Sequence, residues 1–136
     1  MDVRIVIVDD DMDDILLLNE VFSATEYAKS ISFFHNPEGL IPYLDSIPDT
    51  HLPSLIMSDL NMPKLNGFEL LEALKVNSRY QHIPVVIYTT SSSEKERKKA
   101  LSLGAKDFIT KPVHSNAYHK VVEKIREVLD EGQLRG

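Results

Sequence analysis

The feature that most constrains the fold is a short apolar run that ends abruptly in acidic residues. Residues 4–8 consist of Arg4 and four β-branched residues, and Asp9, Asp10 and Asp11 follow directly. A β-branched run without polar alternation is typical of a strand that is buried on both faces, as in a parallel sheet. Similar runs recur along the chain, at residues 30–34, 54–57, 85–88 and 107–109. The sequence therefore predicts five buried strands.

Segments with helical periodicity lie between these runs. Their apolar residues recur three or four positions apart, which is the spacing of one helix face. The residues concerned are Ile15, Leu18 and Phe22; Phe68, Leu71 and Leu74; and Val121, Val122, Ile125, Val128 and Leu129. Strands that alternate with crossover helices predict a doubly wound α/β fold, with a five-stranded parallel sheet and helices on both faces.

Local signals mark where some helices begin. Asn36 before Pro37 fits an N-cap followed by proline at the first helical position, and Ser93 with Glu96 fits a capping box. Pro42 should interrupt the helix that follows the second strand. The helix around residue 42 is therefore the least regular of those that we expect.

One domain accounts for the chain. Its 136 residues, 43% of them hydrophobic, are enough for a single buried core. We assign this domain to residues 1–136, with a core over about residues 3–130. The polar C-terminal tail, residues 131–136, is expected to fray.

The composition argues against several classes of function. Fifteen Lys and Arg residues against 21 Asp and Glu residues give a net charge of −6, which disfavours binding to nucleic acid. The absence of cysteine excludes disulfides, thiolate metal sites and a cysteine nucleophile. No apolar stretch approaches the roughly 20 residues that span a bilayer. We expect a soluble, cytoplasmic protein that binds neither nucleic acid nor membranes.

Polar residues follow the predicted strands and should gather at one edge of the sheet. The functional crevice of such sheets lies outside the carboxyl ends of the strands. Clustered carboxylates repel one another unless a cation neutralises them, and oxygen ligands favour Mg²⁺ or a similar hard ion. The residues that follow the first, third, fourth and fifth strands are Asp9, Asp10 and Asp11; Asp59 and Asn61; Thr89 and Thr90; and Lys111 with Pro112. The sequence therefore predicts a divalent-metal site.

Taken in order, these motifs resemble the receiver domain of two-component response regulators, of the standalone type. The resemblance covers essentially the whole chain and includes Val8-Asp9-Asp10, residues 57–63 with Gly67, Thr89-Thr90, Gly104-Ala105 and Lys111-Pro112. It implies a flavodoxin-like sheet with the strand order 2-1-3-4-5. It also implies a bacterial phosphorelay protein that accepts a phosphoryl group from a histidine kinase or phosphotransfer protein. Such a domain catalyses its own phosphorylation and slow dephosphorylation but is not an enzyme with a separate substrate.

The resemblance also assigns metal ligands. Asp59 is the phosphoacceptor, and Asp10 and Asp59 offer side-chain oxygens to Mg²⁺ or Mn²⁺. Asn61 offers its backbone carbonyl, and Asp9 contacts the ion through a bound water. These four residues are the metal site that we expect.

The remaining motif residues would contact the phosphoryl group or respond to it. Lys111 would pair with a phosphoryl oxygen and with Asp59, from a cis peptide bond to Pro112. The Thr89 hydroxyl and the Thr90 backbone N–H would contact the same group. The phosphoryl group would draw Thr89 inward and leave space for Phe108 to turn inward. This movement would change the face formed by the fourth helix, fifth strand and fifth helix. The alternative is that Phe108 is simply a core residue.

The acidic segment from Asp9 to Asp14, called the acidic opening below, has two other interpretations, and both are weaker. Asp9, Asp11, Asp13 and Glu20 match four ligand positions of an EF-hand loop, but Asp14 stands where that loop needs glycine. The segment before Asp9 is also β-branched, where an EF-hand requires a helix. Asp9 and Asp11 fit the Asp-x-Asp of haloacid-dehalogenase-type phosphotransferases, yet Asp13 departs from that motif.

A third alternative is a receiver-like scaffold that binds partners without being phosphorylated. The complete set of motif residues argues against it. The five histidines show no metal-ligand spacing. The resemblance leaves the target and the oligomeric state open, as a monomer or a phosphorylation-dependent homodimer. The acidic opening is similar to standalone receivers associated with bacteriophytochrome-type kinases.

Overall fold

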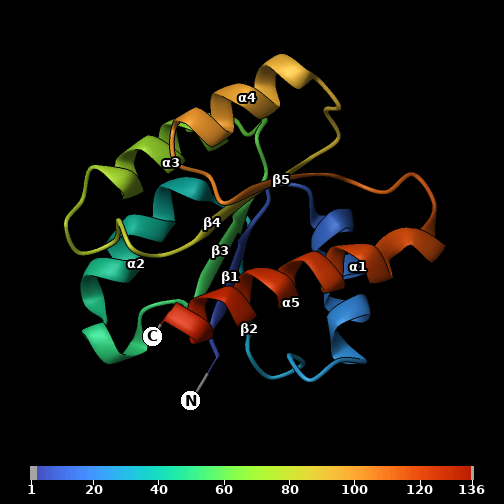
Figure 1. Ribbon diagram of the computed structural model, residues 1–136, viewed down its shortest axis with the longest axis horizontal. Helices are drawn as coiled ribbons and strands as arrows, with labels where there is room; N and C mark the ends of the chain where they lie inside the picture. Colours follow the sequence, from blue (N-terminus) through green and yellow to red (C-terminus); the bar gives the residue numbers. More distant parts are fainter. Residues whose placement is uncertain (1–2, 136) are drawn as a thin grey trace.

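Five parallel strands form the centre of the computed structural model, which describes residues 3–135 (Figure 1). Their order across the sheet is β2-β1-β3-β4-β5, which confirms the expected order 2-1-3-4-5. The strands are β1 (Ile5–Val8), β2 (Ile31–Phe34), β3 (Leu55–Ser58), β4 (Val85–Thr89) and β5 (Asp107–Thr110). Each lies within a residue or two of the predicted run, so the doubly wound α/β fold is confirmed.

Helices cover both faces of the sheet. In Figure 1, α1 (Met12–Ser23) and α5 (Tyr118–Arg135) lie on one side. The other side carries α2 (Leu40–Ser46), α3 (Gly67–Lys75) and α4 (Glu94–Ser102). Short 3₁₀ turns are η1 (Pro37–Gly39), η2 (Asp49–His51) and η3 (Ser115–Ala117). Within residues 3–135, no helix is both long and apolar enough to cross a bilayer.

The core is divided in two by the sheet, and this explains the unbroken apolar runs. Val6 and Val8 pack with residues of α2, α3 and α4, whereas Ile5 and Ile7 pack with residues of α1 and α5. Successive side chains of a strand point to opposite faces, so a strand between two helical layers must be apolar at every position. Burial of each such side chain contributes roughly 1.5–3 kcal/mol to stability.

The register of the strands positions the residues that follow them. Val8 of β1 is paired with Ser58 of β3, so Asp9 and Asp59 come next on neighbouring strands. The Asp59 backbone N–H donates to the Val8 carbonyl oxygen at 2.8 Å, which fixes this pairing at the end of both strands. Polar residues after β1 and β3 therefore meet at one edge.

Helix starts agree only in part with the local signals. The Ser93 hydroxyl accepts the Glu96 backbone N–H at 3.2 Å, as a cap should. The Glu96 carboxylate instead accepts a hydrogen bond from the Ser91 hydroxyl, so the predicted capping box is half formed. Asn36 precedes a helical turn that begins at Pro37, but its side chain makes no capping hydrogen bond.

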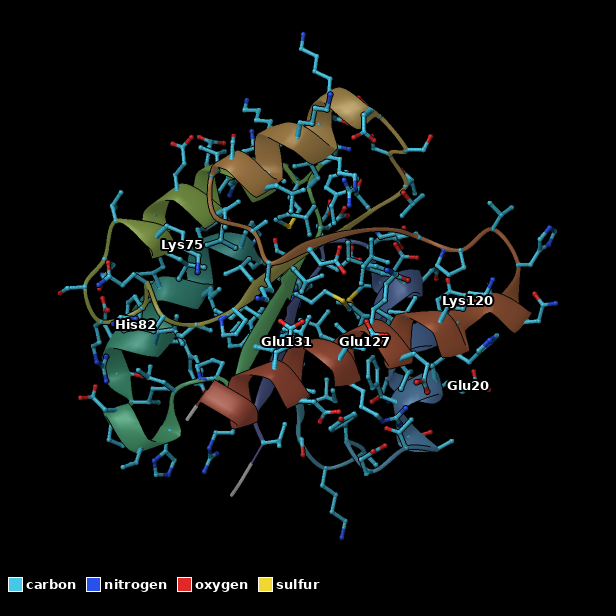
Figure 2. All side chains as sticks on the ribbon, in the orientation of Figure 1. Glu20, Lys75, His82, Lys120, Glu127 and Glu131 are labelled. Carbon is cyan, nitrogen blue, oxygen red and sulfur yellow. The ribbon has the colours of Figure 1, made fainter. Side chains whose placement is uncertain are left out.

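One expectation about helix continuity is wrong. Pro42 lies inside α2 and does not interrupt it, because Pro42 occupies the first turn, where a backbone N–H needs no partner within the helix. The helix α5 continues to Arg135, and the expected fraying of the C-terminal tail stays a prediction. Glu131 pairs with Lys106 at 2.9 Å, and Glu127 and Glu131 project from α5 in Figure 2. Gly136 lies outside the described residues.

Candidate functional site

Three carboxylates converge at the carboxyl ends of β1 and β3. Each of Asp9, Asp10 and Asp59 offers an oxygen, and these atoms lie within 4.8 Å of one another. Asp9 and Asp59 are buried, whereas Asp10 is exposed. A hard divalent cation prefers such oxygen donors, so the residues present fit the predicted metal site. Metal binding itself stays a prediction.

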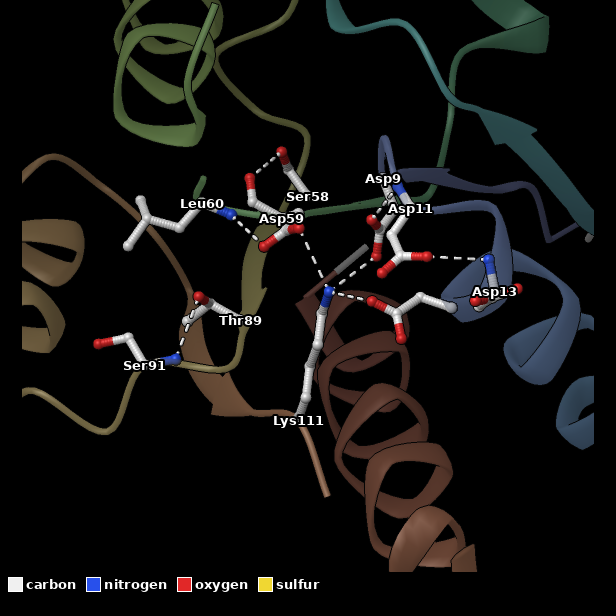
Figure 3. Close-up of polar contacts among 10 residues, drawn as sticks. Asp9, Asp11, Asp13, Ser58, Asp59, Leu60, Thr89, Ser91 and Lys111 are labelled. Atoms are coloured by element: carbon white, nitrogen blue, oxygen red, sulfur yellow. Dashed lines mark hydrogen bonds and ion pairs between the residues drawn. The ribbon is translucent and has the colours of Figure 1, made fainter. Parts of the chain in front are cut away.

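Backbone N–H groups orient two of these carboxylates. Asp9 Oδ1 accepts the Asp11 N–H at 2.9 Å, and Asp59 Oδ1 accepts the Leu60 N–H at 2.7 Å (Figure 3). The Oδ2 atoms of both residues face Lys111. The two carboxylates are therefore held in fixed orientations by the turns that follow their strands.

Lys111 enters the cluster from the end of β5. Its Nζ atom donates to Asp9 Oδ2 at 3.0 Å, to Asp14 Oδ2 at 2.5 Å and to Asp59 Oδ2 at 3.2 Å (Figure 3). Burial alone would lower the pKa of Lys111, but the surrounding carboxylates outweigh burial and hold this pKa above its ordinary value. Lys111 is therefore a fixed positive charge in the site.

Asp9 has an unusual affinity for protons. Its burial raises the pKa from 3.8 to about 6, although the Asp11 N–H and the Lys111 ammonium both favour the ionised form. The Asp59 carboxylate adds repulsion that raises the pKa of Asp9 further. Negative charge is thus crowded in this crevice, which favours a bound cation.

Asp14 also belongs to the site, although the receiver motifs in the sequence did not identify it. It lies in the first turn of α1, and its carboxylate makes the shortest of the three contacts with Lys111. The signal that could have found it is local. Asp11 caps α1 by accepting the Asp13 N–H at 2.9 Å, so Asp14 is the third helical residue, whose side chain points back toward the helix start.

The other predicted residues surround the cluster at different depths. Thr89 is buried at the end of β4, and its hydroxyl accepts the Ser91 N–H at 3.3 Å. Thr90 and Asn61 are exposed. Phe108 is 7% exposed and packs in the core with residues of α3 and α4, as the core interpretation expects. Its role as a switch stays a prediction.

The peptide bond between Lys111 and Pro112 corrects one expectation. No cis peptide bond occurs within residues 3–135, so the cis linkage expected from the resemblance is wrong. The trans form is also the lower in free energy for an X-Pro bond, by about 0.5–1 kcal/mol. The Lys111 N–H donates to the Thr89 carbonyl oxygen at 2.6 Å, which fixes the backbone so that Lys111 still reaches the carboxylates.

The EF-hand interpretation does not fit the geometry. Asp13 and Glu20 belong to the continuous helix α1, and β1 precedes Asp9. An EF-hand needs a loop between two helices over these positions. The acidic opening therefore belongs to a strand end and a helix cap.

Comparisons with known proteins agree with this geometry. The model of the response regulator receiver domain matches residues 5–123. The chain is similar to the phosphorylated cyanobacterial phytochrome response regulator RcpA, with 27% identity, a TM-score of 0.82 and 93% coverage of both chains. It is also similar to RPA3017, a response regulator in red light signalling of R. palustris, with 27% identity, a TM-score of 0.75 and coverage of 90% and 91%.

Longer proteins contain a similar domain. A protein-glutamate methylesterase/protein-glutamine glutaminase of Trichodesmium erythraeum is 33% identical over 128 residues, which are 93% of this chain and 35% of that protein. The response regulator PleD of Caulobacter vibrioides is 34% identical over 113 residues, which are 83% of this chain and 24% of PleD. This chain thus spans about a third or less of these two relatives. The family model matches residues 5–123, which include all five strands and every helix up to the start of α5. The chain therefore belongs to the response regulator receiver domains.

Proposed function

We propose that this receiver accepts a phosphoryl group on Asp59 in a two-component or phosphorelay system. The observation that carries the proposal is the contact of Asp59 Oδ2 with Lys111 Nζ at 3.2 Å, beside the carboxylates of Asp9 and Asp10. A nucleophile, a cation and a set of metal ligands are thereby adjacent in one crevice. The similar RcpA was described in its phosphorylated form, which supports the same chemistry here.

The metal ligands in this proposal are four residues. Asp10 and Asp59 would bind Mg²⁺ or Mn²⁺ through side-chain oxygens, Asn61 through its backbone carbonyl, and Asp9 through a water. A bound divalent ion would offset negative charge on the phosphoryl oxygens. The response regulator Rcp1, which is 25% identical with a TM-score of 0.72, was described in a Mn²⁺-bound form.

The residues of the chain provide the nucleophile and the positioning. With acetyl phosphate as donor, an Asp59 oxygen bonds to phosphorus while the bond from phosphorus to the acetate oxygen breaks, and acetate leaves with the electron pair. Lys111 stabilises negative charge on the phosphoryl oxygens, and the Thr89 hydroxyl and Thr90 N–H donate to them. Positioning and electrostatics account for most of what a protein contributes to phosphoryl transfer.

The test is phosphorylation by acetyl phosphate with Mg²⁺, followed by intact-protein mass spectrometry. The wild type should gain one phosphoryl group, and Asp59→Asn should gain none. Asp13→Asn is the matched control, because Asp13 is an exposed residue of α1 whose carboxylate is not an acceptor of Lys111. Label that persists in Asp59→Asn would overturn the site, and a wild type that is never labelled would favour the scaffold alternative.

The physiological donor in this proposal is a cytoplasmic sensor histidine kinase or a phosphotransfer protein. The similarity to RcpA and RPA3017, both named for phytochrome or red light signalling, supports a kinase of the phytochrome type. Incubation with a purified, radiolabelled kinase of that type should move the label to this chain. A kinase from another pathway is the control, and equal transfer from both would contradict the assignment.

A further inference from the structure

Lys111 uses all of its hydrogen-bonding capacity on three acidic residues. A lysine ammonium has three N–H donors, and Lys111 Nζ contacts the Oδ2 atoms of Asp9, Asp14 and Asp59 (Figure 3). No donor is left for a fourth acceptor. Before transfer, an oxygen of the bound phosphodonor can therefore bond to Lys111 only if one of these carboxylates gives up its contact.

The three carboxylates differ in how easily they can do so. The Asp9 side chain is 1% exposed, so release from Lys111 would leave a buried carboxylate with only the Asp11 N–H as donor. When the phosphodonor binds, Asp59 is still an ionised carboxylate beside Lys111, because its oxygen has not yet bonded to phosphorus. The Asp14 side chain is 25% exposed, so water can solvate its carboxylate after release. A buried charge that loses its partner is costly, whereas a hydrated one is not.

From this difference we infer that Asp14 is a positioning residue that competes with the phosphoryl group for Lys111. In the unphosphorylated state, Asp14 holds Lys111 Nζ from the α1 side of the crevice. When the phosphodonor binds, the ammonium exchanges Asp14 for an oxygen of the donor's phosphoryl group. The inference rests on the proposed function, because it assumes that Asp59 is the acceptor.

This competition predicts a specific kinetic effect. An interaction that exists before the phosphodonor binds and is lost afterwards weakens donor binding without slowing the transfer step. In Asp14→Asn, the acetyl phosphate concentration that gives the half-maximal rate should fall by roughly two- to fivefold, the range of a partly exposed ion pair. The maximal rate should stay within about twofold, since the neutral amide leaves Lys111 bound to Asp9 and Asp59.

The experiment compares Asp14→Asn and four further variants with the wild type by phosphorylation kinetics; the further variants are Asp14→Glu, Asp13→Asn, Lys111→Ala and the double variant Lys111→Ala/Asp14→Asn. Asp14→Glu should behave as the wild type, because it keeps a carboxylate that can reach Lys111. Asp13→Asn removes the same charge from the same turn of α1 and should change nothing. In the Lys111→Ala background, adding Asp14→Asn should have no effect. Equal effects of the substitutions at 13 and 14, or an undiminished Asp14 effect without Lys111, would overturn the inference.

A second measurement separates this inference from the proposed function. The ¹³Cε and ¹⁵Nζ resonances of Lys111 should shift in Asp14→Asn but not in Asp13→Asn, without any phosphodonor. If they shift and the wild type is phosphorylated on Asp59, but half-saturation is unchanged in Asp14→Asn, the inference fails alone. If the wild type accepts no phosphoryl group, the proposed function fails, whatever the resonances show. Resonances that do not respond to Asp14→Asn would refute the ion pair.

Discussion

Gly67 at the start of α3 packs directly against the backbone of Asp59. A Cβ atom at position 67 would overlap the Asp59 carbonyl oxygen and lie 2.9 Å from the Leu60 Cα. The Gly67 N–H also donates to the Leu60 carbonyl oxygen at 2.8 Å. The contact ties α3 to the turn that orients the Asp59 carboxylate, and only a residue without a side chain permits it.

Gly67→Ala should therefore disturb both stability and the site. Because backbone atoms must move, we expect a loss of about 1–3 kcal/mol in the free energy of unfolding. Phosphorylation of Asp59 by acetyl phosphate should slow as well. Chemical denaturation and intact-mass kinetics would measure the two effects. Gly132→Ala is the control, since nothing lies within 4 Å of its added Cβ, and it should stabilise α5 by up to about 1 kcal/mol.

Mg²⁺ should stabilise the fold through the carboxylate cluster. Binding to the folded state alone raises the free energy of unfolding, by about 2.7 kcal/mol at a free ion concentration of about 100 times Kd. Thermal unfolding with Mg²⁺ and with chelator would show the shift. Asp10→Asn should abolish it, and Asp13→Asn should retain it. A shift that needs Asp11 and Asp13 but not Asp10 would instead support a site built on the start of α1.

The raised pKa of Asp9 predicts how stability depends on pH in the absence of metal. Folded Asp9 has a pKa of about 6, against 3.8 for an unperturbed carboxyl, so the folded state holds this proton more tightly. Protonated Asp9 therefore contributes to the free energy of unfolding. This contribution is fully present below the pKa of the unfolded state and is lost as the pH rises through about 6. We expect the free energy of unfolding of the wild type, minus that of Asp9→Asn, to fall over this interval. A difference that rises with pH would mean that Lys111 outweighs burial.

Ser91 links the crevice to α4 and β5, and this predicts the path of the response. Its N–H donates to the Thr89 hydroxyl, its hydroxyl donates to Glu96, and its carbonyl accepts the Thr110 hydroxyl at 2.9 Å. Beryllofluoride, which stands in for the phosphoryl group on Asp59, should draw Thr89 away from Ser91. Amide hydrogen exchange should therefore change between residues 89 and 113.

The same experiment on variants tests the link itself. Ser91→Ala should weaken the exchange response in α4, because the hydroxyl that donates to Glu96 and accepts the Ser93 N–H is lost, while the hydrogen bonds of the Ser91 backbone remain. Ser102→Ala is the control, since the Ser102 hydroxyl donates within the last turn of α4, to the Lys99 carbonyl oxygen. Changes confined to α1 and α2 would contradict an output surface around Phe108.

Local pattern was sufficient to predict the strands and the grouping of polar residues after them. A strand with helices on both sides must be apolar throughout, so an unbroken apolar run such as residues 5–8 is enough to predict a buried strand. Because parallel strands end at one edge, Asp9 and Asp59 could be expected to meet, and their oxygens do lie in one cluster. The strand order and the residue roles came from the resemblance to receivers and not from the pattern.

Contacts between residues far apart in the chain were decided only by the tertiary structure. Asp14 and Lys111 are 97 positions apart, and their ion pair depends on how α1 leaves the sheet beside β1 and on where β5 ends. The Glu96 carboxylate bonds to Ser91 although the sequence predicted a capping box, because the loop brings a competing hydroxyl within reach. Glu131 of α5 likewise pairs with Lys106, which directly precedes β5. Local periodicity records which face of an element is buried, but the partner of a charged side chain is set by packing.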